Sequence, residues 1–458
     1  MRISKFLLFI NLIIAGLLFY FTIGQNELDI SKVDLICILL NHSIFSILFI
    51  KHFKKKPLVS FMFWYVYVSG YILPFIYLLY RKEGMLTLIP GYQGEGLFFP
   101  IFFKLNIIFF LVSLLISKIK LGPSFVNNVR KIGTQRLFVL LTSLYVISII
   151  LTLANSSFYP YYYILFNGQI ILYILITFYV FSENKKSLSF SFLIFILIYV
   201  LYTIFAGSRS GLFNVVFFTL LISLIHQQDF YIKTRRLITF LFLGAFGMIM
   251  YPIATLFRMA RDQGVPFREI ESIWYKLTTS RAGKDILLDI LDMIVARFCM
   301  LNYSFLIDNN LFNESLFNKY FTFSAMFKSA INSTFPLNMY PDVITTSTYL
   351  RVIHENVNIS QLRADWSSYS SILLDYNTLY FGKFSLVITI VFFIMIIKGF
   401  NLISRLRGIH PFITITTLSI LPTLFIFFGY DYLIKAIVHG LIAALSLIFA
   451  VKIFVPKS

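Results

Sequence analysis

Apolar runs long enough to cross a lipid bilayer recur along nearly the whole of this 458-residue sequence. A membrane-spanning helix needs about 20 consecutive apolar residues, and we place about twelve such spans. They cover residues 5–24, 33–50, 58–80, 98–117, 137–154, 161–181, 188–206, 211–225, 237–257, 384–399, 411–428 and 432–451. A water-soluble chain of this length would not be 59% hydrophobic and only 13% charged. The sequence therefore predicts an all-α polytopic membrane protein.

One long polar segment, residues 258–383, interrupts the apolar runs and concentrates arginine, acidic and aromatic residues. Loops longer than about 15 residues are usually functional or disordered, and this one holds too many apolar and aromatic residues for disorder. We therefore predict three parts. A membrane bundle of about nine spans covers residues 1–257, a folded and mainly helical loop domain covers 258–383, and a bundle of about three spans covers 384–458.

The basic residues predict the orientation of the chain, because Lys and Arg crowd the short loops on the cytoplasmic side of membrane proteins. Basic clusters occur at both ends of the chain and in alternate loops, around residues 51–56, 118–136, 185–186, 233–236 and 398–407. The opposite loops are poor in basic residues, apart from Arg81 and Lys82. This pattern predicts that both termini are cytoplasmic and that the polar segment lies outside. The net charge of +19 is thus an orientation signal, and we expect no nucleic-acid partner.

Two sequence features argue against a removed signal peptide and against a disulfide or metal-binding set of cysteines. The first apolar run lacks a small-residue cleavage site, so we interpret it as a retained span and not as a removed signal peptide. The two cysteines, Cys37 and Cys299, form neither a disulfide framework nor a metal-binding spacing.

A tight turn, GSRSG at residues 207–211, joins two apolar runs on the predicted outer side. Arg209 at its centre cannot shed its proton, and a charge at the membrane boundary is costly unless it faces water, a partner or a ligand. The flanking serines can cap the helix that follows, whose N-terminus favours an anion. The turn therefore suits a phosphate, although an arginine that reaches lipid headgroups would explain it equally well.

Together with this turn, the late outer loop and its ending SSYSSILLDYNTLYFG make the chain resemble the O-antigen polymerases, the Wzy-type oligosaccharide repeat-unit polymerases. Ser370 and Ser371 precede Asp375 and Tyr376, as a serine precedes an acidic-aromatic-glycine cluster in that family. Gly382 stands further along than in the family's compact cluster. In the polar segment 258–383, no arginine is followed after ten residues by glycine, a spacing found in some members. The resemblance covers the layout of most of the chain and only short pieces of its sequence.

The resemblance implies a metal-independent glycosyltransferase of the bacterial inner membrane that needs no cofactor. Its donor would be a glycan of O-antigen or capsule type on a polyprenyl (undecaprenyl) diphosphate, and its acceptor a second lipid-linked repeat unit on the periplasmic face. A chain-length regulator and a flippase are further expected partners in lipopolysaccharide or other polysaccharide biosynthesis. An O-antigen ligase of similar layout remains an alternative. So does a flippase for the same lipids, although a flippase would show matching halves and short loops throughout.

Transfer from a diphosphate develops negative charge on the leaving group, so fixed cations near it lower the barrier. Arginine matches phosphate oxygens in bidentate fashion. The predicted diphosphate-binding residues are Arg209, Arg258, Arg261, Arg297 and Arg351. Arg209, Arg258 and Arg261 could instead contact lipid headgroups. Arg297, on the predicted amphipathic helix 285–308, could instead pair with an acid.

The acceptor hydroxyl needs a proton acceptor within hydrogen-bond reach. His354 is the first candidate because its unperturbed pKa lies nearest neutrality, and Asp365 is the alternate base. Trp366, Tyr369 and Asp375 are predicted sugar contacts, since aromatic faces pack on pyranose rings and acids accept hydroxyl hydrogen bonds. Each of these residues could also sit in an ordinary folded loop.

Three ionisable residues of the last apolar run, Asp431, Lys435 and His439, recur every four positions and therefore share one helix face. Ionisable groups inside a membrane usually face a cavity or one another. An internal pair between Asp431 and Lys435 is the plain interpretation. The alternative is that this face lines a groove for the lipid diphosphate together with Lys104 of the fourth span.

Overall fold

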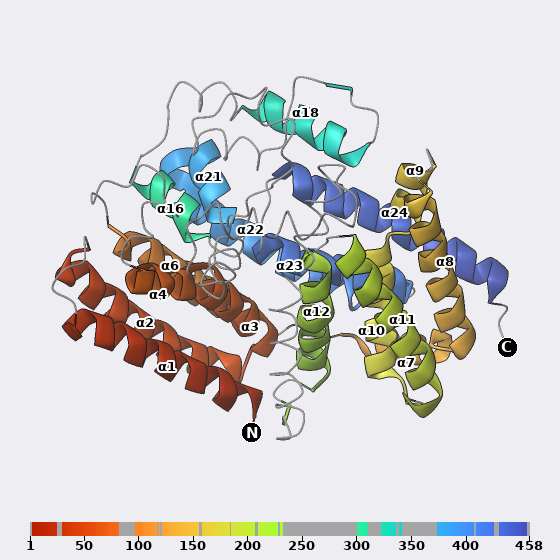
Figure 1. The fold of residues 1–458 in the computed structure, drawn as a ribbon, viewed down its shortest axis with the longest axis horizontal. Coiled ribbons are helices and arrows are strands. Elements are labelled where there is room, and N and C mark those ends of the chain that lie inside the picture. The colour runs from red at the N-terminus through yellow and green to blue at the C-terminus, as the bar shows by residue number, and fades with distance from the viewer. Residues whose placement is uncertain are drawn as a thin grey trace, which may run out of the picture.

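In the described parts of the chain, the regular secondary structure of the computed structural model is helical (Figure 1). The structure describes residues 2–24, 30–81, 97–116, 119, 121–154, 158–183, 185–206, 209–227, 230–231, 300–309, 322–335, 339–340, 373–406, 409–425 and 430–455. Eight helices are long and apolar enough to cross a membrane. Their spans are Ile3–Gly24, Lys32–Phe53, Pro57–Tyr80, Gln135–Leu153, Pro160–Phe181, Ser187–Phe205, Leu373–Ile403 and Tyr430–Phe454.

The predicted all-α membrane class is confirmed, and all the predicted apolar runs but one fall on described helices. Shorter apolar helices cover Phe99–Leu115, Asn214–Gln227 and Pro411–Leu421. The run at 237–257 lies outside the described residues. The total of twelve spans and the side on which the loops lie stay predictions.

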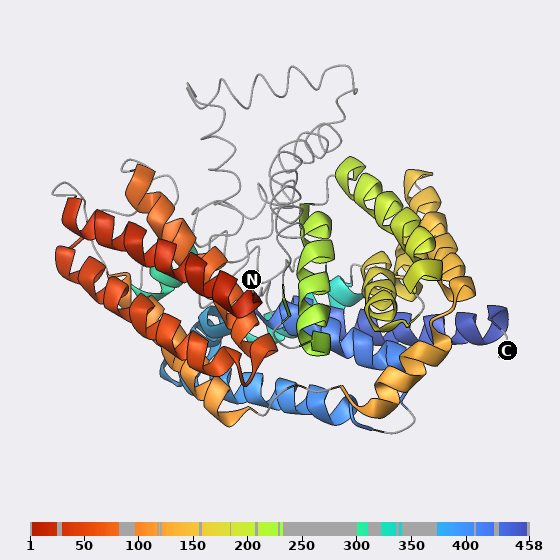
Figure 2. The same ribbon diagram turned by 90° about the horizontal axis from the view of Figure 1, so that it is seen from below.

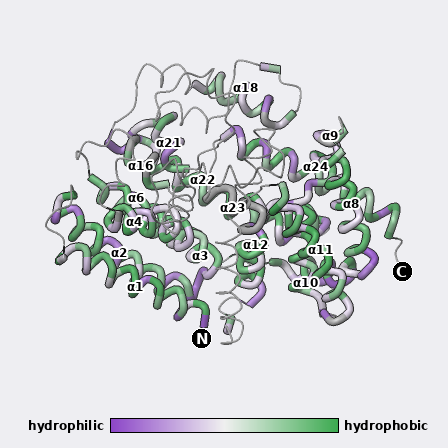
Figure 3. Tube along the Cα trace, viewed as in Figure 1, coloured by the Kyte–Doolittle hydropathy of each residue, from purple (hydrophilic) through white to green (hydrophobic). Residues whose placement is uncertain are grey.

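The outer surface of the helices carries many large apolar side chains, unlike the surface of a water-soluble protein. Large apolar side chains point outward, with Phe9, Phe190 and Phe449 at 56%, 71% and 67% exposure, whereas Asn11 and His42 are buried. Figure 3 shows hydrophobic residues along most of the length of the helices. Lipid is the solvent that makes such a surface favourable, because it removes exposed apolar side chains from water.

The helices form two groups, with the C-terminal helices extending along both (Figure 2). The first group contains α1 (Ile3–Gly24), α2 (Lys32–Phe53), α3 (Pro57–Tyr65), η1 (Val66–Ile72), α4 (Leu73–Arg81) and α6 (Phe99–Leu115). The second contains α7 (Pro123–Ile132), α8 (Gln135–Leu153), α9 (Tyr159–Leu165), α10 (Gly168–Phe181), α11 (Lys185–Phe205) and α12 (Arg209–Gln227). Helix α22 (Ser385–Ile403) packs on α6, and α23 (Pro411–Phe425) and α24 (Tyr430–Phe454) pack on the second group.

Charged side chains from the first group satisfy the free backbone groups at both ends of α6. The Asp34 carboxylate accepts hydrogen bonds from the backbone N–H groups of Phe98 and Phe99, both at 2.9 Å. At the other end, the Lys56 ammonium donates to the carbonyl of Ser113. Helix ends leave such groups without intrahelical partners, so these two contacts fix the position of α6 against α2 and α3.

Helix α10 begins after Asn167, whose side chain accepts hydrogen bonds from the backbone N–H groups of Gln169 and Ile170. Its first residue, Gly168, has no room for a larger side chain. A Cβ atom at Gly168 would lie 2.4 Å from Cε2 of Tyr145, whose ring stacks on Tyr199. We expect Gly168→Ala to destabilise the protein by about 1–3 kcal/mol through overpacking, measured by thermal unfolding in detergent. Gly399 is the matched control, since nothing lies within 4 Å of its Cβ position. Gly399→Ala should stabilise α22, and a loss of stability equal to that of Gly168→Ala would contradict the packing argument.

His410, just before α23, predicts a dependence of stability on pH. Burial and, to a smaller extent, the charge of Lys452 lower the pKa of His410 to about 4. The neutral Nδ1 atom accepts a hydrogen bond from the backbone N–H of Phe412. The unfolded chain takes up this proton near pH 6.5, so stability should fall as the pH drops from about 6.5 to about 4. His410→Asn keeps an acceptor without the titration and should flatten this fall in thermal unfolding; parallel curves for both proteins would refute the assignment.

The described parts of the segment 258–383 are helices that pack onto the membrane helices. They are α16 (Leu301–Asp308), α18 (Phe323–Thr334) and α21 (Leu373–Phe381). Residues 373–383, the end of the predicted loop domain, are helical and continuous with the apolar stretch Leu373–Ile403. A short helix, η3 (Gly382–Phe384), joins α21 to α22, and Gly382 has a φ of 53°. The polar residues of LLDYNTLYFG indicated a loop in the sequence. In the structure, the Asp375 and Asn377 side chains are buried.

Candidate functional site

Helix α16 is held against the first group by a π-helical turn. In η1 the backbone carbonyl of Gly70 accepts a hydrogen bond from the N–H of Met300, at 2.9 Å. A Cβ atom at Gly70 would lie 3.0 Å from Sδ of Met300, so glycine permits the close approach. Wide turns of this kind are frequent at functional sites. Met300 and Leu301 at the start of α16 are buried, at 3% and 0% exposure.

A buried hydrogen-bond chain runs from this turn to α21. The hydroxyl groups of Tyr71 and Ser304 lie 2.9 Å apart, and Ser304 donates to Oδ2 of Asp375 at 2.7 Å. Tyr71, Ser304 and Asp375 are at most 2% exposed. Buried polar groups need such partners because desolvation is costly. The Asp375 carboxylate is therefore anchored between helices and not displayed on a loop.

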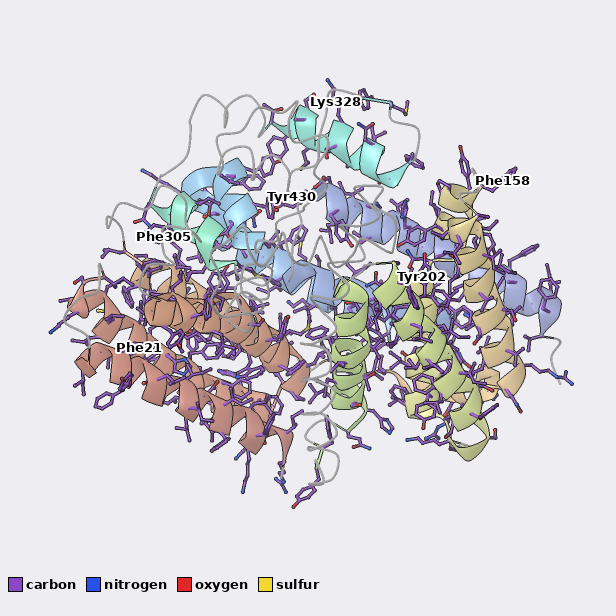
Figure 4. All side chains as sticks on the ribbon, viewed as in Figure 1. Phe21, Phe158, Tyr202, Phe305, Lys328 and Tyr430 are labelled. Carbon is purple, nitrogen blue, oxygen red and sulfur yellow. The ribbon has the colours of Figure 1, made fainter. Side chains whose placement is uncertain are left out.

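The first turn of α24 contacts two helices of the segment 258–383. The Tyr430 hydroxyl donates to Oδ1 of Asn377 on α21, and the Ser329 hydroxyl of α18 donates to Oδ2 of Asp431 at 2.8 Å. Figure 4 shows Tyr430 between α21 and α24, with Lys328 on the far side of α18. These bonds fix α18 and α21 around the beginning of α24.

Two carboxylates act on one buried phenol at this junction. The charges of Asp431 and Asp375 both reach the hydroxyl group of Tyr376, whose side chain is 0% exposed. The hydrogen-bond chain through Asp375 and the contacts of Asp431 therefore belong to one polar cluster. We call Ser304, Asp375, Tyr376, Ser329 and Asp431 the acidic junction.

The predicted polar face of α24 continues from the acidic junction along the helix. Lys435 is half-buried one turn further on, on the same helix face as Asp431. One turn beyond, the His439 ring lies 2.6 Å from the carbonyl oxygen of Thr334 at the end of α18. An ammonium group at this position can bind an anion, because an ionisable side chain within an apolar helix usually faces a cavity, another ion or a ligand.

Lys104 does not join this face. Its ammonium forms an ion pair with Asp308 at the end of α16, at 2.6 Å. Burial raises the pKa of the Asp308 carboxyl, and the hydrogen bond from Lys104 opposes that rise. This pair ties α6 to α16. The proposed grouping of Lys104 with Lys435 is therefore replaced by a structural role for Lys104.

Most of the predicted site residues lie outside the described residues, and their roles stay predictions. Arg209 is the first residue of α12, and Asp375 lies in the acidic junction. The residues outside the described ranges are Arg258, Arg261, Arg297, Arg351, His354, Asp365, Trp366 and Tyr369. Sequence reasoning missed Tyr71, Ser304 and Ser329, because a tyrosine or serine in an apolar helix carries no signal of its partner.

Comparison of this chain with models of protein families, with curated proteins and with solved structures gave no match. The junction of α16, α18, α21 and α24 is therefore the strongest pointer to function in the described part of the chain.

Proposed function

We propose that this protein polymerises oligosaccharide repeat units that are carried on a polyprenyl diphosphate. In this reaction the growing glycan leaves its lipid diphosphate and is transferred to a hydroxyl group of a second lipid-linked unit. The reaction takes place on the outer face of the bacterial inner membrane. The chain thus acts as a glycosyltransferase of the O-antigen or capsule type.

The observation that carries the proposal is the polar face of α24 where it meets helices of the segment 258–383. Asp431, Lys435 and His439 are ionisable residues within a helix long and apolar enough to span a membrane. Such residues are expensive in a bilayer and usually mark a site for a substrate or an ion. The contacts of Asp431 and His439 with α18 join a membrane helix to the segment predicted to carry the chemistry.

The chemistry assigns a role to each kind of residue. As the bond from the anomeric carbon to oxygen breaks, its electron pair stays on the diphosphate, and the acceptor oxygen forms the new bond. Lys435 and Arg209 would stabilise the charge that grows on the leaving group. His354, or Asp365, would take the proton of the acceptor hydroxyl. The acidic junction would hold Lys435 in place through α18 and α21.

A gel of lipid-linked glycans tests the proposal. The wild-type gene is expressed in a strain that makes a matching repeat unit and lacks its own polymerase. The expected result is a ladder of regularly spaced bands, because each transfer adds one repeat unit. A single-unit band at normal protein level would remove the polymerase assignment. Transfer of that single unit to the lipid A core would instead identify a ligase, and accumulation of units on the outer face without transfer would identify a flippase.

A further inference from the structure

Six tyrosine side chains from five helices converge in the second group of helices. We call them the tyrosine cluster: Tyr145 of α8, Tyr163 of α9, Tyr173 of α10, Tyr199 and Tyr202 of α11, and Tyr432 of α24. The ring of Tyr145 stacks on Tyr199, with centroids 5.5 Å apart, and meets Tyr202 edge-on at 6.1 Å. Figure 4 shows Tyr202 on α11, close to α12.

The hydroxyl groups of the cluster are close enough to interact electrostatically. The hydroxyls of Tyr163 and Tyr173 both interact with that of Tyr432. The Tyr199 hydroxyl interacts with those of Tyr145, Tyr173 and Tyr163. The phenols therefore converge on one region between α9, α10, α11 and α24.

Two neutral amides from the start of α10 join these phenols. Gln169 donates a hydrogen bond from Nε2 to the Tyr173 hydroxyl, and the side chain of Asn167 hydrogen-bonds with Tyr163. Phenols and amides donate and accept hydrogen bonds without carrying charge. A binding site for an anion would carry cationic side chains, and a binding site for a metal ion would carry carboxylates. Neutral hydrogen-bonding groups with aromatic faces match an uncharged ligand that is rich in hydroxyl groups.

The exposed fraction of the side chains differs among the six tyrosines and suggests where a ligand would enter the cluster. Tyr145, Tyr173 and Tyr199 are 4%, 4% and 6% exposed, whereas Tyr432 is 39% exposed. Tyr163 and Tyr202 have intermediate exposure. Tyr432 directly follows Asp431, so the first turn of α24 belongs to both the acidic junction and the tyrosine cluster.

We propose that the tyrosine cluster is a carbohydrate-binding subsite with Tyr432 at its entrance. Aromatic rings pack against the C–H face of a pyranose, while phenol and amide groups hydrogen-bond with its hydroxyls. Because Tyr432 adjoins Asp431, a sugar there lies next to the polar face of α24 that would hold the diphosphate. The identity of the natural ligand rests on the proposed function, whereas sugar binding itself is testable without it.

Saturation-transfer difference NMR on the purified full-length protein tests the proposal. The probes are methyl glycosides of neutral hexoses and of N-acetylhexosamines, titrated to obtain dissociation constants. We expect binding of at least one glycoside by the wild type. Tyr432→Phe keeps the ring and loses one hydrogen bond, so binding should weaken about fivefold to tenfold. Tyr432→Ala loses the ring as well and should abolish the signal.

Tyr179→Phe is the matched control. It removes a phenol from the opposite end of α10, where the Tyr179 hydroxyl lies 3.4 Å from Oγ of Ser189, and should leave glycoside binding unchanged. Absence of binding by the wild type, or equal binding by wild type and Tyr432→Ala, would overturn the proposal. Since Tyr432→Phe conserves volume, it tests the hydrogen bond even if Tyr432→Ala fails to fold. A glycan ladder without glycoside binding would reject this subsite alone, and binding without a ladder would reject the polymerase alone.

Discussion

Replacing Arg209 with alanine is expected to reduce glycan transfer by about 10²- to 10³-fold, the usual effect of removing one donor that stabilises charge in a transition state. Arg209 is the first residue of α12, where the free backbone N–H groups and the helix dipole favour an anion. Arg209→Lys keeps the charge but loses the planar fork of donors, so its activity should lie between wild type and alanine. The glycan ladder measures the effect in cells, and the turnover of a lipid diphosphate donor measures it with purified protein.

Arg130→Ala is the control for a general loss of positive charge. Arg130 on α7 pairs with Glu183 at 2.8 Å, and both side chains are exposed, so their pair contributes little to stability. This variant should transfer glycan at the wild-type rate. If Arg209→Ala at equal protein level also gave a wild-type ladder, Arg209 would hold lipid headgroups and would leave the proposed site.

The membrane helices could be predicted from the sequence because hydropathy over 20 residues is a local property. The sequence did not predict that residues 373–383 continue the apolar helical stretch of α22, because their polar side chains, which are buried, resemble those of a loop. Asp375 and Asn377 satisfy their hydrogen bonds with Ser304, Thr389 and Tyr430. Those partners lie 12 to 71 positions away in the chain, and a window of adjacent residues does not contain them.

The candidate site was predictable only where its residues share one helix. The spacing of Asp431, Lys435 and His439 indicated a common face, because helical periodicity relates neighbours in sequence. The same spacing carried no information about Ser329 and Thr334, which contact that face from α18. The role of the π-helical turn could not be predicted either, since the backbone carbonyl of Gly70 accepts its hydrogen bond from Met300, a residue distant in the sequence.

Replacing Lys435 with methionine is expected to reduce glycan transfer by about 100-fold or more, because the leaving diphosphate loses a fixed cation. Methionine keeps the length and most of the apolar volume of lysine, so packing against α18 should persist. Thermal unfolding should also show a loss of stability, since Asp431 then remains buried without the positive charge that attracts it. These two effects have different causes, and a second substitution separates them.

The double variant Lys435→Met/Asp431→Asn removes both charges and keeps an acceptor for the hydroxyl group of Ser329. Asp431 is buried and Lys435 is half-buried. Removing Lys435 alone leaves a buried carboxylate without its nearby cation, whereas removing both charges avoids that cost. If Lys435 binds the diphosphate, the double variant should regain the wild-type unfolding temperature and remain inactive. If Lys435 serves only as a partner for Asp431, recovery of stability should restore the glycan ladder too. An active and stable double variant would therefore remove Lys435 from the site. The polar face of α24 would then have a structural role, because Lys435 and Asp431 would serve only to balance each other's charge.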